Sequence, residues 1–261
     1  MRGLVFDSGV GGLSVTADIR TRLPKLKLDY AADDAFRPYG NKSAEALQAR
    51  LPGLLWSLTH MLRSDFVVLA CNTASTTALP AIRSVLDIPV IGVVPAIKPA
   101  AKASETRHIG VLGTPGTVKR AYVDKLIADH AGACHVSLQG SVTLVQQAEA
   151  KLAGEGVDTD VMVKEIAPFL NQTPPIDHIV LACTHFPLLK AELSKLAGDG
   201  VTWVDSGAAI ARRVETIAGG KAACASNMNQ AQRAFTTGPD ISAARQAIFK
   251  GFGFSRLISL A

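Results

Sequence analysis

The feature that most constrains this chain is the alternation of short apolar runs with longer helical patterns. Short runs rich in β-branched residues are typical of parallel strands that helices cover on both faces. Such runs lie at Gly3–Phe6, Leu28–Ala32, Phe66–Ala70, Val90–Val93, Ile109–Leu112, Ile179–Ala182 and Thr202–Val204. The alternation predicts an α/β fold with parallel sheets, to which Arg233–Thr237 and Arg256–Leu260 would add two further strands.

Helical patterns separate several of these predicted strands. Leu13–Leu23, Val118–His130 and Leu188–Leu196 are the clearest of them. Pro52 and Pro80 stand inside two further candidates. Because proline lacks an N–H and clashes with the preceding turn, we expect both helices to be interrupted there.

Composition excludes several classes of protein. The 261 residues allow one to two domains, and a hydrophobic content of 48% is that of a globular chain. The 27 Lys and Arg exceed the 22 Asp and Glu by five, but no basic run marks a nucleic-acid partner. No apolar run approaches the roughly 18 residues of a membrane span. Asp7 comes too early for a signal peptide, so we expect a cytoplasmic protein.

The cysteines are too few and too dispersed for a disulfide framework. They stand at Cys71, Cys134, Cys183 and Cys224, and none belongs to a CxxC pair, so no metal site is expected. We expect Cys134 and Cys224 to be small buried core residues.

A faint internal repeat relates two parts of the chain. Val68–Thr73 is echoed by Val180–His185, and the two cysteines in these segments are 112 residues apart (183 − 71). Val5–Gly9 has a looser echo in Val111–Gly116 at a similar distance. The repeat predicts two similar parallel-sheet α/β domains that face each other across a central cleft.

Cys71 and Cys183 each follow directly after a predicted strand. In parallel α/β sheets, ligands bind outside the carboxyl ends of the strands. A helix that begins there offers free N–H groups that favour an anion, either a substrate carboxylate or the thiolate itself. Two thiols in one cleft suit stereoinversion, in which one removes a proton from a carbon and the other delivers a proton to the opposite face.

Three other interpretations of the cysteine pair stay open. A cysteine after a strand is often only a small buried hydrophobe. The two thiols could form a redox disulfide, although they lack the CxxC spacing. Alternatively, one could be a nucleophile with His185 as its base, which would leave the second cysteine without a role.

Two polar turns complete the candidate site. Asp7–Gly12 is rich in glycine and lacks the lysine of a Walker motif, so it suits close approach of the backbone to a small ligand. Asp7 could instead serve only as a helix cap. The loop Arg37–Ser43 could close over the same strand ends.

Five segments together resemble the glutamate racemase family, within the aspartate/glutamate racemase superfamily. They occur in the family's order and are Val5–Val15, Pro38–Ser43, Ala70–Ser75, Gly110–Val118 and Leu181–Leu189. The resemblance implies an isomerase that converts L-glutamate to D-glutamate for peptidoglycan synthesis, without pyridoxal phosphate, metal or other cofactor. It also implies a first domain of residues 1–95 plus 208–261 and a second of residues 96–207. A homodimer is possible within such a family.

The resemblance further assigns roles to individual residues. Cys71 and Cys183 would be the two catalytic acid/bases, assisted by Asp7 and His185, with Glu149 as a further acidic residue of the site. The residues expected to hold the substrate are Asp7, Ser8, Tyr39, Gly40, Asn72, Thr73, Thr114, Thr184 and His185. The chain departs from the family around Glu149, where the usual Cys-Pro and Pro-Leu steps are missing.

Two rival functions follow from the same residues. One is a racemase or isomerase of aspartate or a related diacid, which the substrate range would reveal. The other is a non-catalytic binding protein on the same fold, which would turn over no amino acid. The intact pair of thiols argues against the second, since a binder has no evident need for both.

Overall fold

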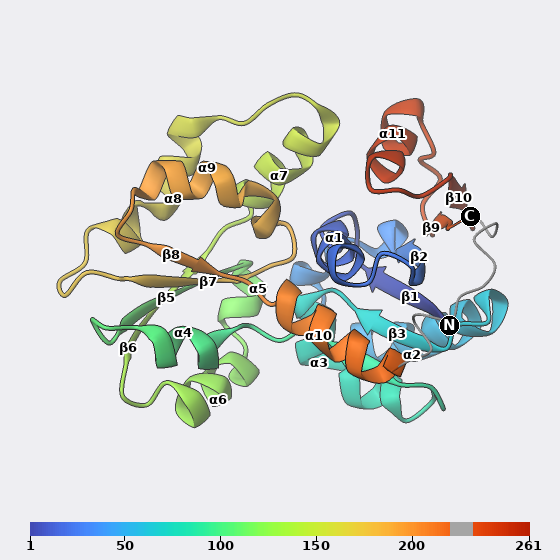
Figure 1. Cartoon of the computed structure of the whole chain (residues 1–261), viewed down its shortest axis with the longest axis horizontal. Helices are drawn as coiled ribbons and strands as arrows, with labels where there is room; N and C mark the ends of the chain where they lie inside the picture. Colours follow the sequence, from blue (N-terminus) through green and yellow to red (C-terminus); the bar gives the residue numbers. More distant parts are fainter. Residues whose placement is uncertain (220–231) are drawn as a thin grey trace. The chain divides into compact units, whose positions relative to one another are not determined.

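The computed structural model describes residues 1–219 and 232–261 and divides into two compact units (Figure 1). The first unit contains Met1–Val93 and Gly207–Ala261, and the second contains Val94–Ser206. Cys224 falls outside the described residues. Cys134 is only partly buried, and its thiol donates to the carbonyl oxygen of Ala101 at 3.7 Å.

In the described part of the first unit, six parallel strands form one sheet in the order β10-β9-β2-β1-β3-β4. The strands are β1 (Arg2–Asp7), β2 (Lys27–Ala32), β3 (Phe66–Leu69), β4 (Val90–Gly92), β9 (Ala234–Thr236) and β10 (Leu257–Ser259). Phe6 pairs with Leu69, so β1 and β3 end side by side. The strands predicted after residue 232 are therefore confirmed.

The second unit has a four-stranded parallel sheet in the order β6-β5-β7-β8. Its strands are β5 (His108–Gly113), β6 (His135–Gly140), β7 (His178–Ala182) and β8 (Thr202–Val204). The order of the strands matches β2-β1-β3-β4 of the first unit, with β5 in the place of β1 and β7 in the place of β3. The predicted class, two similar α/β domains with parallel sheets, is confirmed.

The helices of the first unit are α1 (Leu13–Arg22), α2 (Ala44–Leu62), α3 (Asn72–Arg83), α10 (Gly207–Ala218) and α11 (Ala243–Gly251), with the short η1 (Asp34–Phe36) and η2 (Tyr39–Asn41). Those of the second unit are α4 (Ile97–Ala103), α5 (Pro115–Val118), α6 (Ala121–His130), α7 (Thr143–Ala153), α8 (Thr159–Leu170), η3 (Phe186–Leu189) and α9 (Lys190–Ala197). None of these described helices is both long and apolar enough to cross a bilayer.

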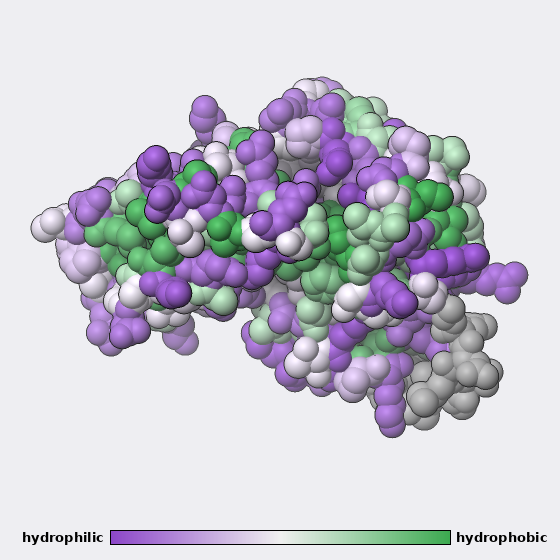
Figure 2. All heavy atoms as spheres, turned by 90° about the horizontal axis from the view of Figure 1, so that it is seen from above, coloured by the Kyte–Doolittle hydropathy of each residue, from purple (hydrophilic) through white to green (hydrophobic). Residues whose placement is uncertain are grey.

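Both faces of the second sheet are covered, which explains why its central strands are apolar throughout (Figure 1). Leu181 packs toward α7, α8 and α9, whereas Val180 packs in a separate cluster with residues of α4 and α6. In the first unit, Phe6 and Leu69 belong to a cluster that includes leucines of α2 and alanines of α3. Figure 2 shows hydrophilic residues spread over the visible face of the molecule, interspersed with hydrophobic ones.

The expectation that proline interrupts two helices is wrong. α2 continues through Pro52 and α3 continues through Pro80. Proline leaves the carbonyl four residues earlier without its helical partner. For Pro52 this carbonyl belongs to Gln48, an exposed residue, so water can hydrate it at little cost.

Three local predictions also need correction. β6 was not predicted, because it is an edge strand with a polar, partly exposed sequence and lacks a continuous apolar run. The helix predicted over Val118–His130 is two helices, since α5 ends at Val118 and α6 begins at Ala121. The helix predicted over Leu188–Leu196 begins as η3 before it becomes α9.

Candidate active site

Asp7 lies at the carboxyl end of β1 and is completely buried. One oxygen of its carboxylate accepts the backbone N–H of Ser8 at 2.7 Å, and the other accepts that of Gly12 at 2.5 Å. The carboxylate therefore shapes the glycine-rich turn as well as facing it. A side chain at Gly12 would not fit, because its Cβ would lie 2.8 Å from the hydroxyl of Tyr30 and 2.9 Å from the Cβ of Asp7.

Cys71 occupies the position immediately before α3. Its Sγ lies 3.8 Å from the Oγ of Ser8, and its residue is 6% exposed. Asn72 and Thr73 follow in the first turn of α3, and both are buried. The Oδ1 of Asn72 has no hydrogen-bond partner among the described residues. The structure thus gathers Asp7, Ser8 and Cys71 at one edge of the sheet, beside polar groups of the helix start.

Tyr39 anchors the loop that carries it and Gly40. Tyr39 is buried, and its hydroxyl donates to Asp33 at 2.6 Å. Burial and the neighbouring carboxylate of Asp33 raise the pKa of Tyr39 far above its usual range. The hydroxyl is a neutral donor committed to Asp33. The contact of Tyr39 and Gly40 with a substrate stays a prediction.

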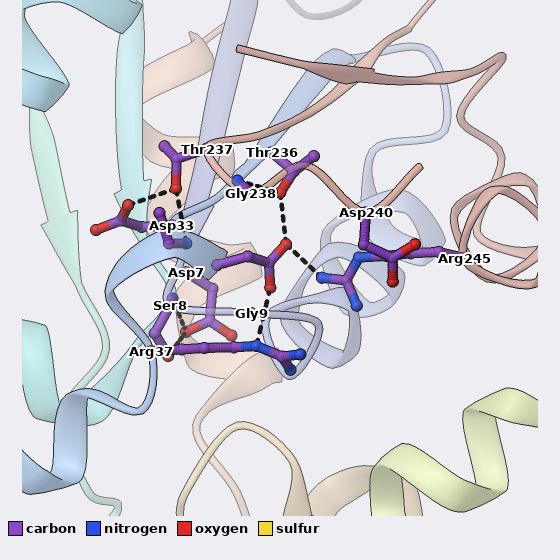
Figure 3. A network of polar contacts seen from close by, with 12 residues as sticks. Asp7, Ser8, Gly9, Asp33, Arg37, Thr236, Thr237, Gly238, Asp240 and Arg245 are labelled. Atoms are coloured by element: carbon purple, nitrogen blue, oxygen red, sulfur yellow. Dashed lines mark hydrogen bonds and ion pairs between the residues drawn. The ribbon is translucent and has the colours of Figure 1, made fainter. Parts of the chain in front are cut away.

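Asp33 and Asp34 organise a polar network that sequence reasoning missed (Figure 3). Asp33 accepts two hydrogen bonds from Arg50, at 2.6 and 2.7 Å, and one from the hydroxyl of Thr237 at 2.7 Å. Burial by itself would raise the pKa of Asp33, but hydrogen bonds from Arg50, Tyr39 and Thr237 outweigh it and lower the pKa. Asp33 follows directly after β2, so the same strand-end rule that selects Asp7 and Cys71 could have selected it.

Asp34 joins the same region to the C-terminal part of the chain. It accepts the hydroxyl of Thr236 at 2.6 Å and forms an ion pair with Arg245 of α11. Its other oxygen lies 3.6 Å from Nε of Arg37. Figure 3 shows these contacts beside the turn of Ser8 and Gly9.

In the second unit, the side chain of His185 lies between those of Cys183 and Glu149. The Sγ of Cys183 lies 3.9 Å from Nδ1 of His185, and Nε2 of His185 lies 3.3 Å from a carboxylate oxygen of Glu149. Cys183 and His185 are buried, whereas the side chain of Glu149 is 38% exposed. Thr184, between the cysteine and the histidine, is buried as well. Although the sequence around Glu149 departs from the family, α7 places it against His185.

Thr114 stands at the end of β5 and caps α5. Its hydroxyl lies 2.9 Å from that of Thr117 and accepts the backbone N–H of Thr117 at 3.2 Å. Thr114 therefore has a structural role of its own, and its contact with a substrate stays a prediction.

The arrangement of these groups suits proton transfer. If Nε2 of His185 donates to Glu149, Nδ1 is left as an acceptor that faces the thiol of Cys183. Cys71, by contrast, faces a hydroxyl and the buried carboxylate region of Asp7. Within the described residues, no group of three or more His, Cys, Asp or Glu side chains has the arrangement of metal ligands.

The chain belongs to the Asp/Glu/Hydantoin racemase family, which matches residues 11–214. Among its relatives is the glutamate racemase of Escherichia coli O139:H28, which is 50% identical over 210 residues, covering 80% of this chain and 74% of the relative. That of Shewanella baltica is 50% identical over 214 residues, with 82% and 77% covered.

Solved structures give the same relationship. A structure of Escherichia coli glutamate racemase in complex with L-glutamate and the activator UDP-MurNAc-ala superimposes with a TM-score of 0.92 at 42% identity, covering 100% of this chain and 98% of that chain. The glutamate racemase of Aquifex pyrophilus superimposes with a TM-score of 0.74 at 32% identity, covering 99% and 98%.

Proposed function

We propose that this chain is an amino-acid racemase that interconverts L-glutamate and D-glutamate. The observation that carries the proposal is the pair of cysteines at the carboxyl ends of the equivalent strands β3 and β7. Cys183 directly follows β7, and Cys71 follows β3 after a single intervening residue, in two similarly ordered sheets. The 50% identity to glutamate racemases and the L-glutamate bound to the Escherichia coli enzyme support glutamate as the substrate.

The proposed reaction uses the two thiols as acid and base. A thiolate at one cysteine removes the proton from the α-carbon, and the electron pair stays on that carbon and its carboxylate. The thiol of the other cysteine then donates its proton to the opposite face, which inverts the centre and leaves that sulfur as a thiolate. For the reverse enantiomer the two cysteines exchange roles, so the step is balanced without an external oxidant or reductant.

Neighbouring groups assist each thiol in this mechanism. In the second unit, Glu149 orients His185 so that its Nδ1 can hold the proton of Cys183. In the first unit, Asp7 and Ser8 lie beside Cys71 and assist it in the corresponding way. We propose that the first unit carries Asp7 and Cys71, and that the second carries Cys183 and His185.

The α-proton of an amino acid without a cofactor is very weakly acidic, so fixed donors must stabilise the developing charge. We assign the stabilisation of this charge to neutral groups. Neutral groups do not compete with the thiolate for a proton. The assigned groups are Ser8, the backbone at Tyr39 and Gly40, Asn72, Thr73 and Thr184, with Thr114 as a further contact.

The biological setting follows from the proposed activity. The family supplies D-glutamate to peptidoglycan synthesis, and we propose the same role here, in the cytoplasm. We also propose that the enzyme works without pyridoxal phosphate or metal, and that it forms a homodimer, which sedimentation would test.

A circular-dichroism assay of purified protein tests the function. With a metal chelator and no pyridoxal phosphate, both L-glutamate and D-glutamate should lose their optical signal, and aspartate should keep it. Cys71→Ala and Cys183→Ala should each lower the rate by at least about 100-fold, as expected when a general acid or base is removed. Turnover of aspartate alone would replace glutamate as the substrate, and no turnover by folded protein would point to a binding protein.

A further inference from the structure

Helix α7 carries a second charged residue whose contacts reach the segment that follows His185. The Nζ of Lys151 donates to the carbonyl oxygen of Leu188 at 2.8 Å and pairs with the carboxylate of Glu192 at 2.6 Å. Glu149, two residues earlier on the same helix, faces His185. α7 is therefore joined to residues 185–192 at two points.

We propose that Lys151 is a positioning residue for the proton relay of Cys183, His185 and Glu149. This inference rests on the proposed function, because it assigns Lys151 a part in the rate of racemisation. Lys151 itself touches none of the reacting atoms. It acts by fixing the helix that presents Glu149.

The geometry explains why one lysine can fix the helix. Leu144 and Ala148 form the buried stripe of α7. At about 100° per residue, Lys151 lies within about 60° of both stripe residues, whereas Glu149 lies about 100° from Ala148 on the other side of the stripe. Contacts at these two angles around α7 oppose rotation of the helix about its axis, which would move the carboxylate of Glu149 away from Nε2 of His185.

Leu188, whose carbonyl oxygen Lys151 binds, also contacts the backbone of His185. The backbone N–H of Leu188 donates to the carbonyl oxygen of His185 at 3.1 Å, so Leu188 belongs to the turn that begins at the histidine. Lys151 binds the carbonyl of this same Leu188. A displacement of α7 relative to the turn would break this contact.

Stability and rate should respond differently to the loss of Lys151. The side chains of Lys151 and Glu192 are 36% and 26% exposed, and ion pairs of this kind contribute little to folding. Catalysis is more sensitive, because a misplacement of about 1 Å can lower a rate by about 100-fold. A positioning role therefore predicts a slower enzyme that is still well folded.

The test compares Lys151→Met with Lys195→Met, a change at an exposed lysine of α9. We expect Lys151→Met to lower kcat about tenfold with KM within about twofold, and Lys195→Met to leave both unchanged. Glu192→Gln should lower kcat in the same direction, and Lys151→Arg should restore most of it. Equal kcat in Lys151→Met and Lys195→Met would overturn the inference.

A double-mutant cycle with Glu149→Gln separates positioning from a general loss of structure. If Lys151 acts through Glu149, Lys151→Met should lower kcat by less than about twofold once Glu149 is replaced. The same tenfold loss in both backgrounds would contradict the inference. Absence of racemisation by the unmodified protein would instead overturn the proposed function, so the two failures are distinguishable.

Discussion

At the residue scale, the chemistry of Cys183 depends on which nitrogen of His185 carries a proton. Glu149 lies 3.3 Å from Nε2, and a carboxylate there favours the form in which Nε2 bears the hydrogen. In the proposed mechanism Nδ1, 3.9 Å from the sulfur, is then the nitrogen that accepts the thiol proton. In the proposed mechanism the carboxylate of Glu149 therefore sets which nitrogen of His185 accepts the proton.

Replacing Glu149 with Gln keeps the shape of this side chain and removes its charge. We expect kcat to fall by about 10- to 100-fold, because neither ring nitrogen is then held in its role. KM for glutamate should change little, since Glu149 is not assigned to substrate binding. The measurement is the racemisation rate as a function of pH, and an unchanged profile would remove Glu149 from the relay.

Gly12 offers a second test at a single residue. An added Cβ would lie 2.8 Å from the hydroxyl of Tyr30 and 3.1 Å from the Cβ of Ala70, both within a packed region. Gly12→Ala should therefore destabilise the protein by about 1–3 kcal/mol and slow the reaction by displacing the turn that Asp7 holds. Thermal unfolding provides the readout.

Gly53 provides the matched control, because an added Cβ there meets no atom within 4 Å and the residue lies in α2. Gly53→Ala should stabilise the protein by about 0.5–1 kcal/mol. Equal effects of the two substitutions would show that the turn after β1 is not tightly packed.

At the scale of elements, the sequence predicted central strands better than edges. Central strands such as β5 and β7 are apolar on both faces and stand out from their surroundings. β6 has a partner on one side only and carries polar residues that are exposed or partly exposed, so its sequence does not distinguish it from a loop. Proline misled the prediction of α2, because the carbonyl it leaves without a helical partner belongs to an exposed residue, Gln48.

In the candidate site, too, some residues could be found from the sequence and others could not. The cysteines and Asp7 could be found because they stand at or just after the carboxyl ends of strands. Lys151 and Arg245 could not, because their partners are far away in the sequence and only the folded chain brings them together. Their contacts depend on helix orientation, which a hydrophobic pattern fixes only approximately.

Asp33 binds the hydroxyl of Tyr39 in the loop before α2. Its contribution to the stability of the folded protein should therefore depend on pH. The pKa of Asp33 is lowered in the folded protein, so its contribution is complete above the ordinary value of about 3.9 and is lost as the pH falls through the lower folded value. At pH 7, Asp33→Asn should cost about 2–3 kcal/mol, because hydrogen bonds to a charged group are lost. The difference from the unmodified protein should shrink below about pH 4.

Chemical denaturation at several pH values measures this difference. Asp199→Asn, at an exposed position, serves as the control and should have little effect at any pH. A difference for Asp33→Asn that grows as the solution becomes more acidic would contradict the assigned sign.

At the scale of the whole molecule, the chain uses one sheet order twice. β2-β1-β3-β4 and β6-β5-β7-β8 are equivalent, and a cysteine follows the third strand of each set. Their surroundings nevertheless differ, since Cys71 faces Ser8 whereas Cys183 faces His185. A reaction whose two directions begin from mirror-image substrates suits two thiols in similar folds with different assistants.

Deuterium incorporation shows whether two different thiols remove and deliver the proton. Racemisation of L-glutamate is started in deuterium oxide, and both enantiomers are separated early in the reaction and examined by mass spectrometry. We expect deuterium at the α-carbon of nearly all the D-glutamate formed, while the remaining L-glutamate keeps its protium. Equal deuterium in both enantiomers, or protium retained in the product, would contradict a mechanism with two separate thiols.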